Sequence, residues 1–214
     1  MKREFTKPLL ITFEGGEACG KSTQSKIFYD WYKFNYDPEA IHTREPGGVS
    51  LSEKIRGLLL ETKGVSISPL SELLLFQASR SQFFNEFVLP TLKEGKSIIC
   101  DRGVDSTTAY QGYGRGQDVA MIESLNLIST QNRFPDLTFI IDIQYSHGLK
   151  IRRAQEGTVN RLDLEDEEFH KTVNEGYRHL ALSNKERIVI LDYEVGIEKV
   201  QAKLREEFMK KYSL

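Results

Sequence analysis

The segment from Gly15 to Ser22 constrains this chain more than any other, because its spacing matches G-x-x-x-x-G-K-[ST]. Residues 9–13 are mostly apolar and predict a short buried strand before it, and apolar side chains at helical spacing predict a helix over residues 21–36. In such a strand–loop–helix unit, glycines let backbone N–H groups turn toward a phosphate at the helix N-terminus. The sequence therefore predicts a phosphate-binding loop of the kind that ATP- and GTP-using enzymes carry.

Two side chains of this loop have expected chemical roles. Lys21 is expected to act catalytically by reaching the β- and γ-phosphates, and Ser22 is expected to hold Mg²⁺ through its hydroxyl. Asp101 is a second candidate for Mg²⁺ because it ends an apolar strand predicted over residues 97–100, although an ordinary turn aspartate is the alternative. The segment as a whole predicts ATP contacts from Gly15, Gly16, Glu17, Ala18, Cys19, Gly20, Lys21, Ser22 and Thr23.

Length and composition allow one sizeable core. The chain has 214 residues with a 39% hydrophobic share, which predicts a single domain over residues 1–214. Its 29 basic and 31 acidic residues nearly balance, so no nucleic-acid partner is expected. No apolar run reaches membrane-spanning length, and two cysteines make no disulfide framework. We therefore expect a cytoplasmic protein that binds neither membranes nor nucleic acid.

Predicted strands and helices alternate along the whole chain. The strands centre around residues 10, 41, 98, 140 and 189. Helices after the first are predicted over residues 52–61, 70–87, 118–131, 164–184 and 197–211, with Pro90 limiting or kinking the second of these. Such alternation predicts an α/β fold: a five-stranded parallel sheet between two layers of helices.

Some finer expectations follow from the pattern. Ile55, Leu58 and Leu59 are expected to face inward, and Met121, Leu125 and Ile128 share one side of a helix. Residues 112–116 are rich in glycine and predict a mobile connection. Residues 148–163 mix basic side chains with a glycine and predict a lid that opens and closes.

Three classes of protein with a phosphate loop compete at this point. A GTPase switch should carry an Asn/Thr-Lys-x-Asp segment after a late strand, but those strands end in Asp142-Ile143-Gln144 and Asp192-Tyr193-Glu194. A transport or mechanical ATPase would be longer and carry a signature loop that this chain lacks. A small-molecule kinase requires a second site with arginines and a lid with arginines, and the sequence offers candidates for both.

Further motifs occur in a fixed order: Thr43-Arg44-Glu45-Pro46-Gly47-Gly48, Leu74-Leu75-Phe76-Gln77-Ala78-Ser79-Arg80, Asp101-Arg102…Ser106-Thr107-Thr108-Ala109-Tyr110-Gln111, and Asn160-Arg161-Leu162-Asp163. With these motifs and the phosphate loop, nearly the whole chain resembles the thymidylate kinases. The resemblance implies a P-loop nucleoside-monophosphate kinase fold and the reaction ATP + dTMP → ADP + dTDP with Mg²⁺. The block from Asp101 to Gln111 is its most specific part.

The resemblance also implies roles for individual side chains. Phe76 is expected to stack on thymine, Arg80 to donate to the base oxygen O4, and Tyr110 to lie under the sugar. Taken alone, Phe76 and Tyr110 would each be read as core residues rather than as ligand contacts. Arg102 is expected to be catalytic and, with Arg56, to hold the dTMP phosphate. The full set expected to contact dTMP is Glu17, Glu45, Arg56, Phe76, Arg80, Arg102, Ser106, Thr107, Tyr110 and Gln111.

Some members of this family place a catalytic arginine inside the phosphate loop, but residues 16–19 contain no basic side chain. The family's other, mostly bacterial sub-type supplies the charge from the lid, where Lys150, Arg152, Arg153 and Arg161 provide it here. Arg152 and Arg153 are both candidates for the catalytic residue, and the sequence does not choose between them. Arg161 is expected to bind ATP.

Two further expectations concern association and reactivity. The family is usually homodimeric, and the apolar helices around Leu58, Leu74 and Leu125 are candidates for the contact. Cys19 lies in a loop that attracts anions, so its thiol is either unusually reactive or simply a small packing residue. Cys100 ends a buried strand and should react more slowly.

Overall fold

The computed structural model describes residues 7–60, 66–154, 159–193 and 196–214, and these contain a parallel five-stranded sheet. The strands are β1 (Leu10–Glu14), β2 (Ile41–Arg44), β3 (Ile98–Asp101), β4 (Leu137–Asp142) and β5 (Ile188–Asp192). Their order is β2-β3-β1-β4-β5, and every neighbouring pair runs parallel. All five predicted strands are confirmed, with small shifts at their ends.

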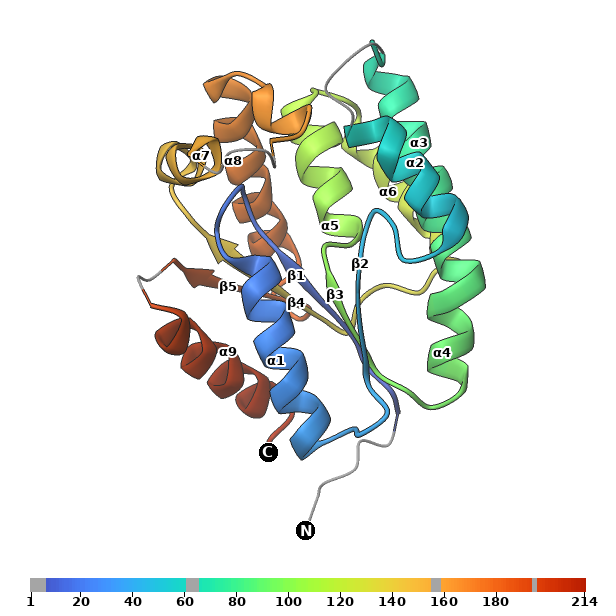
Figure 1. Cartoon of the computed structure of the whole chain (residues 1–214), viewed down its shortest axis with the longest axis vertical. Helices are drawn as coiled ribbons and strands as arrows, with labels where there is room; N and C mark the ends of the chain where they lie inside the picture. Colours follow the sequence, from blue (N-terminus) through green and yellow to red (C-terminus); the bar gives the residue numbers. More distant parts are fainter. Residues whose placement is uncertain (1–6, 61–65, 155–158, 194–195) are drawn as a thin grey trace.

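Helices cover both faces of this sheet (Figure 1). On one face α1 and α9 lie side by side, and on the other α8 packs against β4 and β5. The predicted α/β/α fold is therefore confirmed. The α-helices are α1 (Lys21–Asn35), α2 (Ser50–Leu60), α3 (Pro69–Phe83), α4 (Leu89–Lys93), α5 (Val104–Thr107), α6 (Val119–Ser129), α7 (Tyr145–Arg153), α8 (Glu167–Ser183) and α9 (Ile197–Lys211).

Aromatic rings form much of the core under α1 and α9. Phe28 of α1 lies 5.4 Å from Phe13 of β1, 5.6 Å from Phe139 of β4 and 5.6 Å from Phe208 of α9, measured between ring centroids. Rings at such spacing prefer tilted and edge-on contacts, and they bury large apolar areas. This cluster fixes α1 against the sheet, and the phosphate loop is the segment that joins β1 to α1.

The predicted helix over residues 70–87 is interrupted. It forms α3, the π-helical turn η1 (Phe84–Val88) and then α4, which contains Pro90. Proline has no backbone N–H and blocks the normal ladder one turn earlier, so a wider turn before it removes the conflict. Pro90 is thus accommodated within a helical segment rather than ending it.

The prediction of a mobile connection over residues 112–116 is wrong for most of that segment. Helix α5 continues as the π-helix η2 (Thr108–Gly114). A Cβ at Gly114 would lie 2.7 Å from the Phe169 ring and 2.8 Å from Val173, both on α8. The glycine therefore serves close packing of η2 on α8 and not flexibility.

The prediction that Leu58 faces inward is also wrong, whereas Ile55 and Leu59 are buried as predicted. Leu58 is 50% exposed. On α6, the side that carries Met121 and Ile128 faces outward, and Ile128 is 72% exposed. The buried face of α6 carries Ile122 and Asn126 instead. Apolar residues occupy more than one side of α6, so periodicity alone could not select the buried side.

The segment predicted as a lid falls into three parts. Residues 148–153 belong to α7, residues 159–163 approach the site described below, and residues 155–158 lie outside the described residues. The end of this segment enters a short 3₁₀ turn, η3 (Leu162–Leu164). None of the helices in the described ranges has both the length and the apolar character required to cross a membrane.

Candidate active site

The site lies at the carboxyl ends of β1 and β3. The central strand β1 has β3 on one side and β4 on the other, so the strand order reverses there. Loops that leave a parallel sheet at such a point diverge and open a crevice that binds ligands. The phosphate loop follows β1, and Asp101 and Arg102 follow β3.

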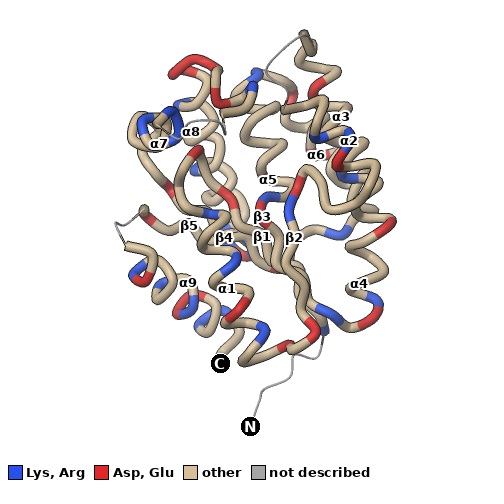
Figure 2. The backbone as a smooth tube through the Cα atoms, viewed as in Figure 1, with Lys and Arg blue, Asp and Glu red and all other residues tan. Residues whose placement is uncertain are grey.

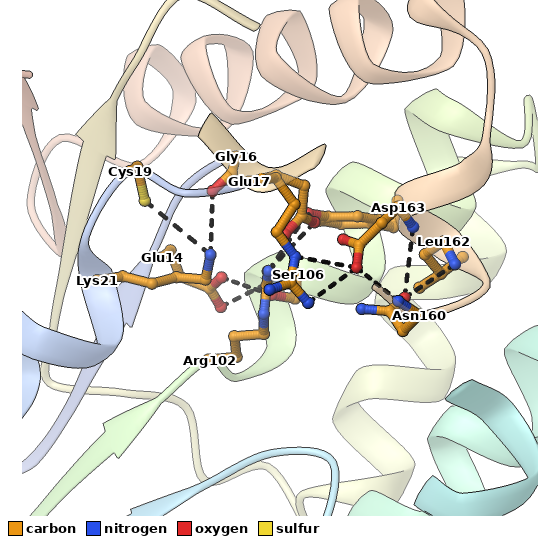
Figure 3. A network of polar contacts seen from close by, with 12 residues as sticks. Glu14, Gly16, Glu17, Cys19, Lys21, Arg102, Ser106, Asn160, Leu162 and Asp163 are labelled. Atoms are coloured by element: carbon orange, nitrogen blue, oxygen red, sulfur yellow. Dashed lines mark hydrogen bonds and ion pairs between the residues drawn. The ribbon is translucent and has the colours of Figure 1, made fainter. Parts of the chain in front are cut away.

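The phosphate loop has the backbone that the sequence predicts. Gly15 and Gly20 have φ values of 135° and 86°, which favour glycine, and a Cβ on Gly15 would collide with the carbonyl oxygen of Ile141. Lys21 is buried, and its Nζ donates a hydrogen bond to the Gly16 carbonyl at 3.0 Å. The lysine is thereby held over the loop at the N-terminus of α1 (Figure 3).

A polar cavity of about 360 Å³ lies over this loop, and we call it the loop pocket. Ser22 and Asp101, the expected Mg²⁺ ligands, both line it. Of the residues expected to bind ATP, Gly15, Gly16, Cys19 and Arg161 do not line it. Its full lining is Glu17, Ala18, Gly20, Lys21, Ser22, Thr23, Arg44, Glu45, Arg56, Asp101, Arg102, Arg152 and Asn160.

A smaller cavity of about 100 Å³, the inner pocket, lies beside it. All ten residues expected to contact dTMP line it, although they come from β1–α1, β2–α2, α3, β3–α5 and η2. Five further residues line it as well. The complete lining is Glu17, Glu45, Pro46, Arg56, Leu60, Phe76, Arg80, Arg102, Gly103, Ser106, Thr107, Tyr110, Gln111, Asn160 and Leu162.

The two pockets share a set of residues that we call the junction: Glu17, Glu45, Arg56, Arg102 and Asn160. A shared lining means that ligands in the two pockets would meet there. Two arginines and two carboxylates give this point its charge, and arginine is well suited to hold phosphate at it.

Arg102 lies at the centre of the junction in a strained backbone conformation, with φ of 73°. Its guanidinium donates to Ser106 Oγ at 3.1 Å and to Glu17 Oε1 at 3.4 Å (Figure 3). It also donates to Tyr110 Oη at 3.3 Å. Burial alone would lower the pKa of Arg102, but the surrounding Tyr110 and Glu17 raise it well above its ordinary value. The arginine therefore stays charged.

Glu17 faces Arg102 across the junction and also accepts a short hydrogen bond from Tyr110. Burial alone would raise the pKa of Glu17, but Arg102, Lys21 and the Tyr110 hydroxyl outweigh it and lower the pKa to about 2. The junction therefore holds an ionised carboxylate at neutral pH, placed between the two pockets.

Behind the junction lies Glu14, a buried carboxylate to which the sequence gave no role. It accepts hydrogen bonds from the backbone N–H groups of Gly103 (2.7 Å) and Ser106 (3.1 Å), and from Ser106 Oγ (2.5 Å) and Tyr177 Oη (2.9 Å). Burial, followed by the nearby charge of Asp105, raises the pKa of Glu14 to about 7. Glu14 thus fixes the turn that carries Arg102.

Arg80 is buried in the wall of the inner pocket, where hydrogen bonds hold all three of its nitrogens. Its Nε donates to Glu45 at 2.8 Å, and its two terminal nitrogens donate to Asn126 Oδ1 and the Gly103 carbonyl, both at 3.0 Å. Three of its five N–H groups are used, which leaves two for a ligand. The sequence did not identify Glu45 as the partner whose negative charge offsets the cost of burying Arg80.

The structure distinguishes the basic residues of the lid. Arg152 lines the loop pocket and pairs with buried Asp163 at 2.9 Å, whereas Lys150 and Arg153 are exposed and line neither pocket. Lys150, Arg152 and Arg153 together give α7 its positive charge (Figure 2). Arg161 lies outside both linings and pairs with Glu72 of α3. The arrangement brings Arg152 to the site and places Arg161 away from the expected ATP position.

Cys19 is buried in the core under the phosphate loop and does not face the loop pocket. Burial raises the pKa of its thiol, although Lys21 lowers it in part. The anion-attracting field of the loop therefore does not produce a thiolate, and the alternative of a small packing residue is favoured. Cys100 is buried too, and burial raises the pKa of its thiol well above the usual value.

Sequence reasoning missed some residues at the site, and the sequence contains a signal for some of them. Asn160 and Leu162 flank Arg161 within a motif that the sequence did reveal. Glu72 lies one turn before Phe76 and two turns before Arg80, so all three share a face of α3. A glutamate on the same helix face as two expected ligand contacts was the one signal in the sequence that Glu72 supports the site.

A phosphate loop, an arginine-lined second pocket that joins it and an arginine from α7 define a P-loop kinase of the nucleoside-monophosphate type. A family model for thymidylate kinase matches residues 13–204. A thymidylate kinase of Gloeobacter violaceus is 41% identical over 198 residues, with 92% of each chain covered, and one of Clostridium novyi is 43% identical over 195 residues, with 91% of this chain and 95% of that one covered.

Solved structures agree with these relatives. The crystal structure of thymidylate kinase from Ehrlichia chaffeensis superposes with a TM-score of 0.78 at 34% identity, and the match covers 95% of this chain and 99% of that chain. The chain belongs to the thymidylate kinase family.

Proposed function

We propose that this chain transfers the γ-phosphate of ATP to dTMP and releases dTDP and ADP. The observation that carries the proposal is the inner pocket. Ten residues expected to contact dTMP come from five segments of the chain and line one cavity, and that cavity joins the loop pocket at Arg102. Membership of the family supports the same substrate.

In this proposal the nucleoside of dTMP occupies the inner pocket. Phe76 supplies a flat apolar face for thymine, and Arg80 has N–H groups left to donate to a carbonyl oxygen of the base. Thr107 and Gln111 would hydrogen-bond the base, and Tyr110 would lie against the sugar. A donor at the position of O4 favours thymine over cytosine, which carries an amine there.

The phosphates would meet at the junction. Arg102 and Arg56 would hold the phosphate of dTMP, while Lys21 and the loop backbone would hold the β- and γ-phosphates of ATP. Arg152 would add positive charge where the phosphoryl group is transferred. No side chain has to act as a nucleophile, because positioning and charge neutralisation carry this reaction.

The residues present fit a Mg²⁺ ion that enters with ATP. Asp101 Oδ1 is buried and has no hydrogen-bond partner among the described residues, and Ser22 lines the same pocket. No group of three metal-binding side chains exists in the parts of the chain that the structure describes, so phosphate and water oxygens would complete the coordination. The ion would neutralise charge on the phosphates.

A homodimer also belongs to this proposal. Exposed apolar side chains lie on the adjacent helices α2, α3 and α6, including Leu58, Leu74, Met121 and Ile128. Apolar surface of this kind marks association sites. Sedimentation should show two copies for the natural chain and one for Leu58→Glu; a natural chain that sediments as a single copy would contradict the dimer. The two unpaired cysteines support a cytoplasmic location.

A coupled assay of ADP release across the nucleoside monophosphates tests the proposed reaction. We expect dTMP to have the highest kcat/KM, with dCMP, AMP and GMP far below it. A preference for any of those three would mean that the base contacts assigned to the inner pocket are wrong.

A further inference from the structure

Glu72 of α3 is a buried carboxylate on which three side chains converge. Gln111 Nε2 donates to it at 2.9 Å, Arg115 donates at 3.1 and 3.2 Å, and Arg161 donates at 2.5 Å. Gln111 lies in η2 and Arg115 directly follows it, whereas Arg161 is much later in the sequence. Glu72 itself is 1% exposed and lines neither pocket.

The charges around Glu72 are balanced. Arg115 binds a second carboxylate, Glu165, at 2.5 Å, and stacks over the Phe169 ring at 4.7 Å. Burial would raise the pKa of Glu72, but hydrogen bonds from Arg115, Gln111 and Arg161 outweigh it and lower the pKa. An ionised, fully bonded carboxylate holds its partners in fixed positions, because moving any of them would leave a buried charge unpaired.

Arg161 connects this carboxylate to the end of α2. Its Nε donates to the Leu59 carbonyl at 3.1 Å, and its backbone N–H donates to the Leu60 carbonyl at 3.3 Å. The last carbonyls of a helix have no partner within it, so they are ready acceptors. The next residue, Leu162, is buried and lines the inner pocket together with Leu60. Arg161 therefore fixes one wall of that pocket without touching its contents.

Gln111 connects the same carboxylate to the opposite wall. Gln111 is buried and lines the inner pocket, and its amide nitrogen is committed to Glu72. A carboxylate accepts only, so it selects the NH₂ end of the amide and turns the carbonyl oxygen away from itself. A carbonyl oxygen facing the pocket can accept from the N3–H of thymine, whereas cytosine has an acceptor at that position.

We propose that Glu72 is a positioning residue for the acceptor nucleotide: it orients the Gln111 amide for base discrimination and, through Arg161, holds Leu162 in the pocket wall. The inference rests on the proposed function, because it assigns the inner pocket to dTMP. It also gives Arg161 a different task from the ATP contact that the sequence suggested.

Steady-state kinetics of Glu72→Gln test the proposal. The glutamine keeps the shape, removes the charge and replaces one of the two acceptor oxygens with an NH₂ donor. Gln111 and Arg161 bind different oxygens of Glu72, so they cannot both keep their fixed partner. We expect the KM for dTMP to rise about tenfold or more, the size of a lost charge-assisted hydrogen bond. The KM for ATP should change less than twofold, and the preference for dTMP over dCMP should fall. An unchanged KM for dTMP, or equal rises in both KM values, would overturn the proposal.

A matched control separates positioning from stability. Arg133 and Asp136 form a part-buried pair, also at 2.5 Å, just before β4, at the amino end of the strand and so away from the site. Arg133→Ala should lower the melting temperature and leave both KM values and the dTMP preference unchanged. If Glu72→Gln behaves like Arg133→Ala, the role of Glu72 is only structural.

Arg161→Ala provides a second variant if Glu72→Gln folds poorly. It should raise the KM for dTMP while keeping the preference over dCMP, because Gln111 stays bound to Glu72. Loss of that preference, or no change in KM, would contradict the division of roles. Calorimetry with the natural protein separates failure of this inference from failure of the proposed function. If another monophosphate binds better than dTMP, the proposed substrate is wrong. The effect of Glu72→Gln is then measured as the change in KM for that monophosphate.

Discussion

The loop pocket and the inner pocket touch at Arg102, yet they are built in different ways. The loop pocket takes much of its wall from one continuous stretch, residues 17–23, and a single motif specifies it. The inner pocket assembles short pieces of β2–α2, α3, β3–α5 and η2 with Asn160 and Leu162. The pocket proposed to bind phosphates thus depends on local sequence, whereas the pocket proposed to bind the base depends on tertiary structure.

The two pockets also differ in how their polar groups are held. In the inner pocket, Arg80 is tied to Glu45 and Gln111 is tied to Glu72. These contacts fix the donors and acceptors before a base arrives, which favours selectivity. The loop pocket relies instead on backbone N–H groups, Lys21 and Arg152, which suit any polyphosphate. Mutations should therefore affect rate in one pocket and acceptor binding in the other.

Among the variants that distinguish the two pockets, Arg152→Ala is expected to have the largest effect, a loss of kcat. The side chain lines the loop pocket, so its loss should lower kcat by roughly 10³-fold or more with little change in the affinity for dTMP. Arg153→Ala is the matched control, because Arg153 is exposed and lines neither pocket. Stopped-flow or steady-state rates measure both variants. Equal losses would show that the structure does not separate the two arginines.

Arg80→Ala should affect stability and acceptor binding together. It leaves the Glu45 carboxylate buried without its cation, which costs about 3–5 kcal/mol of unfolding free energy. The affinity for dTMP should fall by roughly 1.5–3 kcal/mol, while the affinity for ATP should hold. Urea unfolding and calorimetry give the two values. A variant that binds dTMP normally would remove Arg80 from base recognition.

Glu14→Gln should change the pH dependence of stability. The folded pKa of Glu14 is about 7 against a usual value of 4.5, so the unfolded chain ionises first as pH rises. The stability that Glu14 contributes is complete below about pH 4.5 and is lost as pH rises through about 7. The difference corresponds to up to about 3 kcal/mol.

Urea unfolding at several pH values would measure this effect. The natural chain should lose stability relative to Glu14→Gln between pH 4.5 and 7.5. Parallel curves for the two proteins over this range would show that Glu14 does not titrate there.

The smallest effect is expected at Cys19. Because its thiol is buried and burial raises its pKa, alkylation at neutral pH should be slow at both cysteines. Mass mapping after limited treatment should find little label and little loss of activity. Rapid labelling of Cys19 that Mg-ATP prevents would mean that the loop pocket activates the thiol after all.

The sequence predicted the phosphate loop, the five parallel strands and ten of the residues that line the inner pocket, the last through a resemblance. It did not predict the partners of the buried charges. Glu45 pairs with Arg80 over 35 positions, and Glu72 pairs with Arg161 over 89 positions. Periodicity describes one element at a time, so it cannot show which distant side chains meet. For the same reason it could not choose between Arg152 and Arg153.

Competition binding of a joined ligand tests the central claim that the two pockets form one continuous site. Adenosine linked to thymidine through a chain of phosphates should bind at one copy per chain, as measured by calorimetry. Saturating ATP alone and saturating dTMP alone should each exclude it. Binding that only one of the two nucleotides prevents, or two copies bound to each chain, would contradict a site in which both ligands meet at Arg102.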